Sequence, residues 1–330
     1  MTFLSDKTLE RLRRAETPPD LSGTRYVLRE LIARGGMGVV YAADDERLSR
    51  RVALKILDER DASGELASRL IREAHILARL EHPGIVPVHD VGVLPDGRTF
   101  YTMKLVQGSR LDQHLGKLDS LPQRLRLFLR ICDAVAFAHA RGVLHRDLKP
   151  ANIMVGSFGQ VLVMDWGLAK TLTDHGQVDG TTLSSGRANE ADDPAPSSVI
   201  TGHGTIMGTP GYMSPEQARG DTEQVDVRSD VFSLGALLKF AAGGGIPRQL
   251  PRPLAAICAK ATAENPDARY AEVSALAAEV SSYLDGMPVS AYSETFWELL
   301  ERFYKRHQVA ILLITAYIIM RAMVLLIFRH

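Results

Sequence analysis

One short segment of the sequence holds three side chains at a spacing suited to phosphoryl transfer. Segment 145–152 reads HRDLKPAN, and DWG follows at 165–167. Asp147 can accept a proton from a substrate hydroxyl, Lys149 can neutralise a moving phosphoryl group, and Asn152 can bind a metal ion. Asp165 offers a second oxygen ligand for such an ion. An unpatterned polar loop would have little reason to hold these residue types at this spacing.

A second group of residues, nearer the N-terminus, is suited to binding phosphates. Segment 33–40 reads ARGGMGVV, and its glycines allow a hairpin backbone to lie close over phosphates with N–H groups pointing at them. Lys55 follows in an apolar strand, where a buried charge needs a partner, and Glu73 on the next predicted helix is the candidate. Taken alone, the glycine segment could be a plain hairpin turn, and Lys55 and Glu73 could be solvated surface residues.

Together these segments resemble a bacterial serine/threonine protein kinase of the eukaryotic-like (Hanks) type, from about residue 25 to residue 286. The resemblance implies that Asp147 is the catalytic base, that Lys149 stabilises charge, and that Lys55 and Glu73 orient phosphates. A lysine at the position of Lys149 accompanies serine/threonine specificity in this family. The function expected is transfer of the γ-phosphate of ATP to Ser and Thr hydroxyls of protein substrates.

The resemblance also implies a nucleotide and a metal site. The metal would be Mg²⁺, with Mn²⁺ as a substitute, held by Asn152 and Asp165. The ATP-binding residues implied are Ala33, Arg34, Gly35, Gly36, Met37, Gly38, Val40, Ala53, Lys55, Met103, Lys104 and Val106. The chain departs from the family pattern at Ala33, where glycine is usual, at Trp166, where phenylalanine is usual, and at Ser214, where alanine is usual. We expect a slightly stiffer loop at Ala33 and a filled pocket at Trp166.

The resemblance further implies a regulated activation segment. Arg146, beside the catalytic Asp, would need an anion such as a phosphothreonine, and Thr201 and Thr205 are the candidates for autophosphorylation. These hydroxyls could instead be solvated loop residues. Thr209 is expected near the catalytic loop. Two structural contacts are also implied, a Glu216–Arg269 ion pair and support of the catalytic loop by Asp230.

Periodicity along the chain indicates an α+β protein with two lobes. Strand patterns occupy most of 26–57 and 85–106, and apolar residues at helical spacing predict a helix over 65–80. We expect a lead-in at 1–24 and a kinase domain at 25–286, with a small β-rich lobe over about 25–106. A mostly helical lobe would cover about 107–286. Residues 171–205 have almost no large apolar side chain, so we expect a mobile segment there.

Composition narrows the function classes. Lys+Arg and Asp+Glu both total 39 in 330 residues, so no excess positive charge supports bulk binding of nucleic acid. Cys132 and Cys258 are far apart and are expected to be buried thiols in a reducing compartment. The N-terminus lacks the apolar core of a signal peptide, because residues 8–14 are charged.

The C-terminal part of the sequence is strongly apolar. Residues 309–328 hold a single charge, Arg321, and their length suits a transmembrane helix. Residues 287–308 would form a juxtamembrane interfacial segment, and 329–330 a tail. This pattern predicts a single-pass protein of the inner membrane with its kinase domain in the cytoplasm. The alternative is a helix that is buried in the globular domain.

One departure from the family pattern weakens the prediction of activity. Between Ala242 and Pro253 the family has about thirty more residues, including a helix that helps to dock substrates. The alternative function is therefore a nucleotide-binding, kinase-like scaffold with weak or no transfer activity. A small-molecule kinase on the same fold is disfavoured, because the segments GTPGY and SPE build a platform for protein substrates. Self-association for phosphorylation in trans is also expected.

Overall fold

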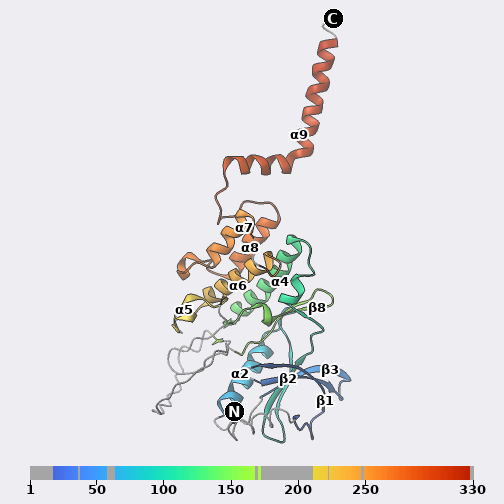
Figure 1. Ribbon diagram of the computed structural model, residues 1–330, viewed down its shortest axis with the longest axis vertical. Coiled ribbons are helices and arrows are strands. Elements are labelled where there is room, and N and C mark those ends of the chain that lie inside the picture. The colour runs from blue at the N-terminus through green and yellow to red at the C-terminus, as the bar shows by residue number, and fades with distance from the viewer. Residues whose placement is uncertain are drawn as a thin grey trace, which may run out of the picture.

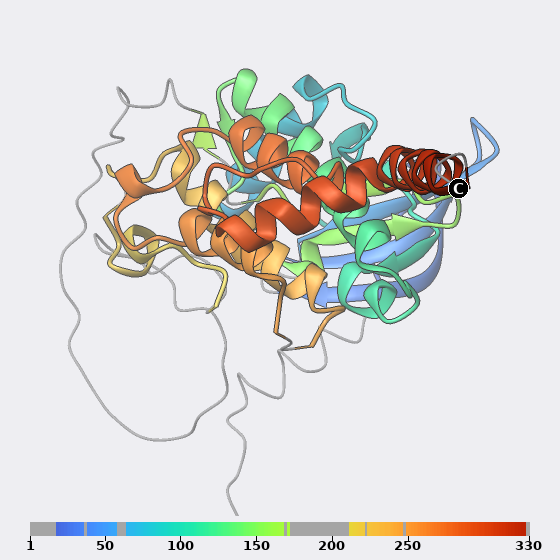
Figure 2. The same cartoon turned by 90° about the horizontal axis from the view of Figure 1, so that it is seen from above.

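The computed structural model describes residues 18–35, 38–57, 64–167, 170–171, 211–221, 223–246 and 249–327. They form a small β-rich lobe with one helix and a larger helical lobe (Figure 1). Figure 2 turns the molecule by 90° and shows the first part of the C-terminal helix running across the end of the large lobe. The predicted two-lobed α+β architecture is therefore confirmed.

The small lobe is built on a five-stranded antiparallel sheet. Its strands are β1 (Tyr26–Gly35), β2 (Gly38–Asp45), β3 (Arg50–Ile56), β4 (Val88–Val93) and β5 (Thr99–Lys104), in the order β1-β2-β3-β5-β4. Helix α2 (Glu65–Arg79) covers one face with Leu70, Ala74 and Leu77, which lie three or four residues apart. A separate cluster that includes Tyr26 and Phe100 covers the other face. Strands β3 and β5 are therefore enclosed on both sides, and β5 shows no alternation of buried and exposed residues.

The large lobe packs its helices around α6. Its elements are β6 (Gly108–Arg110), α3 (Leu111–Leu115), α4 (Leu121–Ala140), β7 (Val143–Leu144), η1 (Pro150–Asn152), β8 (Ile153–Gly156), β9 (Val161–Val163), β10 (Lys170–Thr171), α5 (Pro215–Ala218), α6 (Val227–Ala242), α7 (Arg252–Ala261), η2 (Pro266–Ala268) and α8 (Val273–Leu284). Helix α6 is buried on several sides, and Leu234, Leu237 and Leu238 are fully enclosed. The N-terminal end of α6 lies beside the loop between β7 and β8, so a buried helix supports that loop.

The connection that follows α6, from residue 243 onward, turns at two glycines and is bonded by an arginine of α4. Gly244 and Gly245 adopt positive φ values of 77° and 86°, which turn the chain sharply. The guanidinium of Arg124, on α4, donates from Nη1 to the carbonyl of Ala242 at 3.1 Å, which satisfies an acceptor at the end of α6. The side chain of Ile246 remains 63% exposed. An apolar side chain is thus exposed after α6, while the last carbonyl of that helix is bonded from within the lobe.

The prediction of a transmembrane helix at 309–328 is wrong. Within the described ranges, no helix has both the length and the apolar character needed to cross a membrane. The apolar run is not a separate element, because it continues a helix that begins earlier, α9 (Phe296–Ile327). The prediction set the apolar side chains of 309–328 against the single charge of Arg321, which costs roughly 2.5–3.5 kcal/mol at a bilayer centre, and judged that they outweigh it. The location in the inner membrane depended on this helix and stays an untested prediction.

Candidate active site between the lobes

Two residues of the catalytic-loop motif converge on the carboxylate of the third, Asp147. Lys149 donates from Nζ to Oδ2 of Asp147 at 2.7 Å, and Asn152 donates from Nδ2 to the same oxygen at 3.1 Å. Asn152 also donates to the backbone carbonyl of Asp147 at 2.8 Å. Because the amide nitrogen of Asn152 makes both bonds, its Oδ1 is left to serve as a ligand for a cation. The structure therefore brings together the predicted base, charge stabiliser and metal ligand.

The backbone just before Asp147 is fixed from two sides. Asp230 accepts the N–H groups of His145 and Arg146, both at 2.8 Å, and the carbonyl of Arg146 accepts a bond from Nε2 of Gln217 at 2.8 Å. Arg146 has a φ of 69°, an unfavourable backbone conformation for a residue with a side chain. These bonds hold that conformation in place. The predicted support of the catalytic loop by Asp230 is confirmed.

The carboxylate of Asp230 is itself held ionised inside the protein. Burial opposes its charge, but a bond from Nε2 of His139 at 2.8 Å and the amide of His145 outweigh burial, so the pKa of Asp230 is lowered. Sequence reasoning missed both His139 and Gln217. Only the fold reveals them, through the bond of Gln217 to the carbonyl of Arg146 and the bond of His139 to Asp230, because neither lies in the segments quoted for the catalytic motif.

The predicted pair of Lys55 and Glu73 forms inside the small lobe. Nζ of Lys55 lies 2.9 Å from each carboxylate oxygen of Glu73 and 3.4 Å from Oδ1 of Asp165. Burial opposes the charge of Lys55, but Tyr101, Glu73 and Asp165 together raise its pKa. Partial desolvation also opposes ionisation of Asp165, and Lys55, His145 and Lys149 outweigh it, so the pKa of Asp165 is lowered. Lys55 and Asp165 are therefore both charged at neutral pH.

Trp166 fills an enclosed position next to Asp165, the predicted metal ligand. Its side chain is fully buried, its indole N–H donates to the carbonyl of Val163 at 3.3 Å, and its ring centroid lies 4.6 Å from that of His145. Asp165, the preceding residue, has a φ of 59°. The larger aromatic ring thus occupies a filled site, as expected, and the residue before it is held in a strained backbone conformation.

The structure describes most of the predicted nucleotide-binding residues but not all of them. Ala33, Arg34 and Gly35 pair with Val40, Val39 and Gly38 in the β1–β2 hairpin, while Gly36 and Met37 lie outside the described residues. A Cβ atom at Gly38 would lie 2.2 Å from the carbonyl oxygen of Ile56, so only glycine fits there. The hairpin therefore keeps its backbone within reach of β3 at this end of the sheet.

Ala53 and Met103 pair across β3 and β5 and are buried in the main core cluster. The N–H of Lys104 donates to the carbonyl of Pro87 at 3.1 Å, so it is not available to a purine. Val106 follows in the loop after β5 and is half-buried. Within the predicted adenine site, Lys104 can therefore offer only an acceptor from its backbone.

The donor set fits a nucleotide-bound magnesium ion. Within the described part of the chain, no group of three or more His, Cys, Asp or Glu side chains could hold a metal alone. Asn152 and Asp165 could provide two ligands, and the side chain of Asp165 is 47% exposed. Mg²⁺ commonly uses one or two protein oxygens and completes its shell with phosphates and water.

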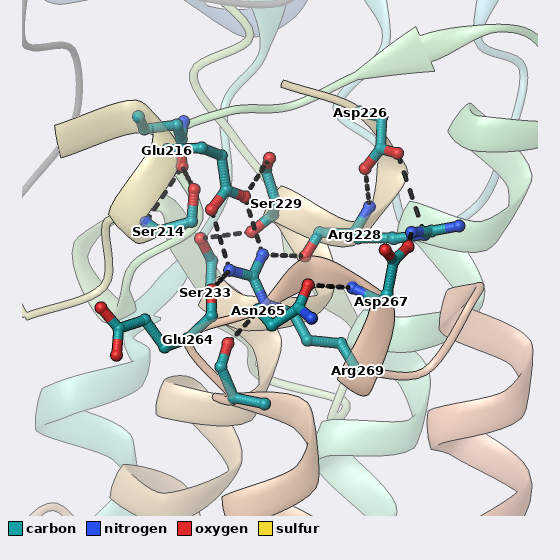
Figure 3. A network of polar contacts seen from close by, with 12 residues as sticks. Ser214, Glu216, Asp226, Arg228, Ser229, Ser233, Glu264, Asn265, Asp267 and Arg269 are labelled. Atoms are coloured by element: carbon teal, nitrogen blue, oxygen red, sulfur yellow. Dashed lines mark hydrogen bonds and ion pairs between the residues drawn. The ribbon is translucent and has the colours of Figure 1, made fainter. Parts of the chain in front are cut away.

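The predicted lock of the large lobe forms as a closed network (Figure 3). Nη1 and Nη2 of Arg269 donate to the two oxygens of Glu216 at 2.7 and 2.8 Å, and Ser229 donates to Oε1 at 2.7 Å. Burial opposes the charge of Glu216, but these bonds lower its pKa to about 2. This pair fixes α5, and with it Gln217, against α6. The remaining predicted residues of the activation segment, Thr201, Thr205 and Thr209, lie outside the described residues.

Comparison with known proteins agrees with this geometry. The family model for the protein kinase domain matches residues 26–250. Serine/threonine-protein kinase PknD of Chlamydia caviae is 35% identical over 305 residues, which cover 80% of this chain and 32% of the relative. PknD of Chlamydia trachomatis serovar D is 36% identical over 310 residues, which cover 80% of this chain and 32% of the relative. The chain thus spans about a third of the length of these curated relatives.

Solved structures show the same fold. The crystal structure of the Mycobacterium tuberculosis PknI kinase domain aligns with a TM-score of 0.55 at 24% identity, covering 81% of this chain and 98% of that chain. A double mutant of the same domain aligns with a TM-score of 0.57, covering 79% and 96%. The family match spans most of the chain and includes the catalytic loop, the Lys55–Glu73 pair and the Glu216 segment. The chain therefore belongs to the protein kinase family, as its resemblance to bacterial Hanks-type kinases predicts.

Proposed function

We propose that this protein transfers the γ-phosphate of Mg-ATP to serine and threonine hydroxyls of proteins. The observation that carries the proposal is the convergence of Lys149 and Asn152 on the carboxylate of Asp147. That arrangement gives one carboxylate the proton-accepting role and keeps a cation 2.7 Å from it. The serine/threonine class is supported by Lys149 and by the PknD relatives.

The residues of the candidate active site have separate roles in the proposed reaction. Asp147 orients the attacking hydroxyl and accepts its proton, and Lys149 stabilises charge on the group in transit. Lys55, held by Glu73, binds phosphate oxygens of the nucleotide. Asn152 and Asp165 would hold magnesium, which supplies neutralisation of the phosphate charge when it is bound.

We also propose autophosphorylation of the activation segment, at Thr201 or Thr205. Burial lowers the pKa of the Arg146 guanidinium, and the nearby charge of Asp230 opposes this effect without cancelling it. Within the described ranges, no carboxylate lies within ion-pair distance of that guanidinium. A phosphate brought beside Arg146 would supply a counter-charge within ion-pair distance and strengthen the fixed backbone before Asp147.

The test is transfer of radiolabelled γ-phosphate by the full chain with Mg²⁺, using wild type, Asp147→Asn and Asp133→Asn. Asp133 is exposed on α4, so its substitution makes the same charge change away from the cleft. We expect Asp147→Asn to lower the rate by about 10²–10⁴-fold and Asp133→Asn to leave it unchanged. Nucleotide binding without label on the chain or on a protein substrate would contradict the proposal and favour the scaffold alternative.

Phosphorylation in trans has its own test. Wild type is mixed with the inactive Asp147→Asn chain, and label on each chain is mapped by mass spectrometry. Label at Thr201 or Thr205 of the inactive chain would support transfer between copies. Label that appears only on the wild-type chain would restrict autophosphorylation to a reaction within one molecule.

A further inference from the structure

The hydroxyl of Tyr101 is a third partner in the Lys55–Glu73 pair. Tyr101 lies on β5 directly opposite Lys55 of β3 in the strand register. Its hydroxyl donates to Oε1 of Glu73 at 2.9 Å, and Nζ of Lys55 lies 5.6 Å from the centre of its ring. The tyrosine is 1% exposed, so solvent cannot replace this bond.

The bonds of Glu73 show why a third partner matters. The Glu73 side chain is fully buried, and Lys55 and Tyr101 both donate to its carboxylate. Lys55 is shared, because its Nζ also lies 3.4 Å from Asp165 at the edge of the cleft. In the proposed function it must bind phosphate oxygens as well. Whenever the ammonium turns toward the cleft, the hydroxyl of Tyr101 still satisfies the buried carboxylate.

The hydroxyl of Tyr101 stays protonated and can therefore donate a hydrogen bond. Burial, with the nearby charge of Glu73, raises the pKa of Tyr101 well above its ordinary value, so the group stays protonated across the physiological range. The ring is held rigidly because α2 covers one face of β5 and the cluster that includes Tyr26 and Phe100 covers the other. A movement of α2 away from the sheet would break the bonds to Lys55 and to Tyr101 together.

We propose that Tyr101 is a positioning residue that holds Glu73, and with it α2, in the arrangement that pairs with Lys55. The inference relies on the proposed roles of Lys55 and Glu73. The bond joins β5 to α2 and involves no residue of the activation segment. It therefore keeps part of the protein in the paired arrangement before any phosphorylation of that segment, and so sustains a basal activity.

The test substitutes Tyr101→Phe in the full chain, with Tyr26→Phe as the matched control. Tyr26 is buried in the same sheet and its hydroxyl donates to a carboxylate, Asp90, at 2.9 Å, but it belongs to the cluster on the opposite face. We expect Tyr101→Phe to lower kcat for a generic basic protein substrate about tenfold, with little change in KM for that substrate. Tyr26→Phe should keep kcat within about twofold of the wild-type value. It should lower the free energy of unfolding about as much as Tyr101→Phe does.

Hydrogen exchange of the nucleotide-free protein separates this inference from the proposed function, because it needs no activity. Amides of α2 should exchange about tenfold faster in Tyr101→Phe than in wild type or in Tyr26→Phe. In a Glu73→Gln background the added effect of Tyr101→Phe on this exchange should shrink, because the two groups act as a unit. If wild type shows no transfer, the proposed function fails and exchange alone decides this inference. Unchanged α2 exchange, or an unchanged kcat in an active protein, would overturn it.

Discussion

Two buried ion pairs in this protein have matching parts but different surroundings. Glu216 pairs with Arg269 and accepts a hydroxyl bond from Ser229, and Glu73 pairs with Lys55 and accepts a hydroxyl bond from Tyr101. In both pairs the glutamate side chain is essentially inaccessible to solvent. The pairs differ in where the remaining N–H groups of the cation point.

The arginine pair is closed. Besides Glu216, Arg269 donates to the backbone carbonyls of Ala263, Arg228 and Glu264 at 2.7–3.0 Å, so each guanidinium N–H has an acceptor (Figure 3). The lysine pair is open, because its remaining contact is a longer one of 3.4 Å to the half-exposed Asp165. A closed network stabilises one structure, whereas an open one can exchange a partner. We therefore assign stability to the first pair and phosphate binding to the second.

The largest effect should follow from breaking the closed pair. Arg269→Met leaves the Glu216 carboxylate buried without its cation, and we expect the free energy of unfolding to fall by about 3–5 kcal/mol. Urea unfolding of the full chain measures it. Arg219→Met is the control, because Arg219 pairs with Asp221 at the surface and should cost about 0–1 kcal/mol. Equal losses in the two variants would contradict the assignment.

Breaking the open pair should act mainly on transfer. Lys55→Met removes the cation that faces the cleft, and we expect kcat/KM for ATP to fall by about 10²–10³-fold. Its loss of stability should be smaller than that of Arg269→Met, because α2 lies on the lobe surface and can move to let Glu73 reach water. Steady-state kinetics and urea unfolding of the same samples check both parts. A larger stability loss for Lys55→Met than for Arg269→Met would reverse the comparison.

Acid should weaken the closed pair within a defined range. Glu216 has a pKa of about 2 in the folded protein, below its ordinary value of 4.5. Its contribution is therefore fully present above pH 4.5 and is lost as the pH falls toward 2. The total is about 3 kcal/mol. The free energy of unfolding, measured in urea at several pH values between these limits, should fall more steeply with falling pH for wild type than for Glu216→Gln. An equal dependence on pH in the two proteins would contradict the low pKa.

The sequence predicted the two ion pairs but not all of the partners that support them. Lys55, Glu73, Glu216 and Arg269 lie in motifs with family-wide spacing, so a resemblance was enough to pair them. Tyr101 could not be found in this way, because its role depends on which residue of β5 lies opposite Lys55. Strand register is set by packing on both faces of the sheet and is not visible in a single sequence.

The C-terminal error has a different origin. A count of apolar residues over 309–328 treated that stretch as an independent element. The structure instead joins it to a longer helix that starts at Phe296. Gln217 and His139 were missed because only the folded chain brings Gln217 to the carbonyl of Arg146 and His139 to the carboxylate of Asp230. Local motifs located the chemistry, while contacts between distant segments determined how it is held.

The most direct test makes one chemical change at both pairs and measures transfer and stability together. Glu73→Gln and Glu216→Gln each remove one negative charge and keep the shape of the side chain. We predict that Glu73→Gln loses at least tenfold in γ-phosphate transfer with a small change in unfolding free energy. Glu216→Gln should lose several kcal/mol of stability and keep near-normal transfer per folded molecule. Equal losses of transfer in the two folded variants would contradict the division between an open catalytic pair and a closed structural one.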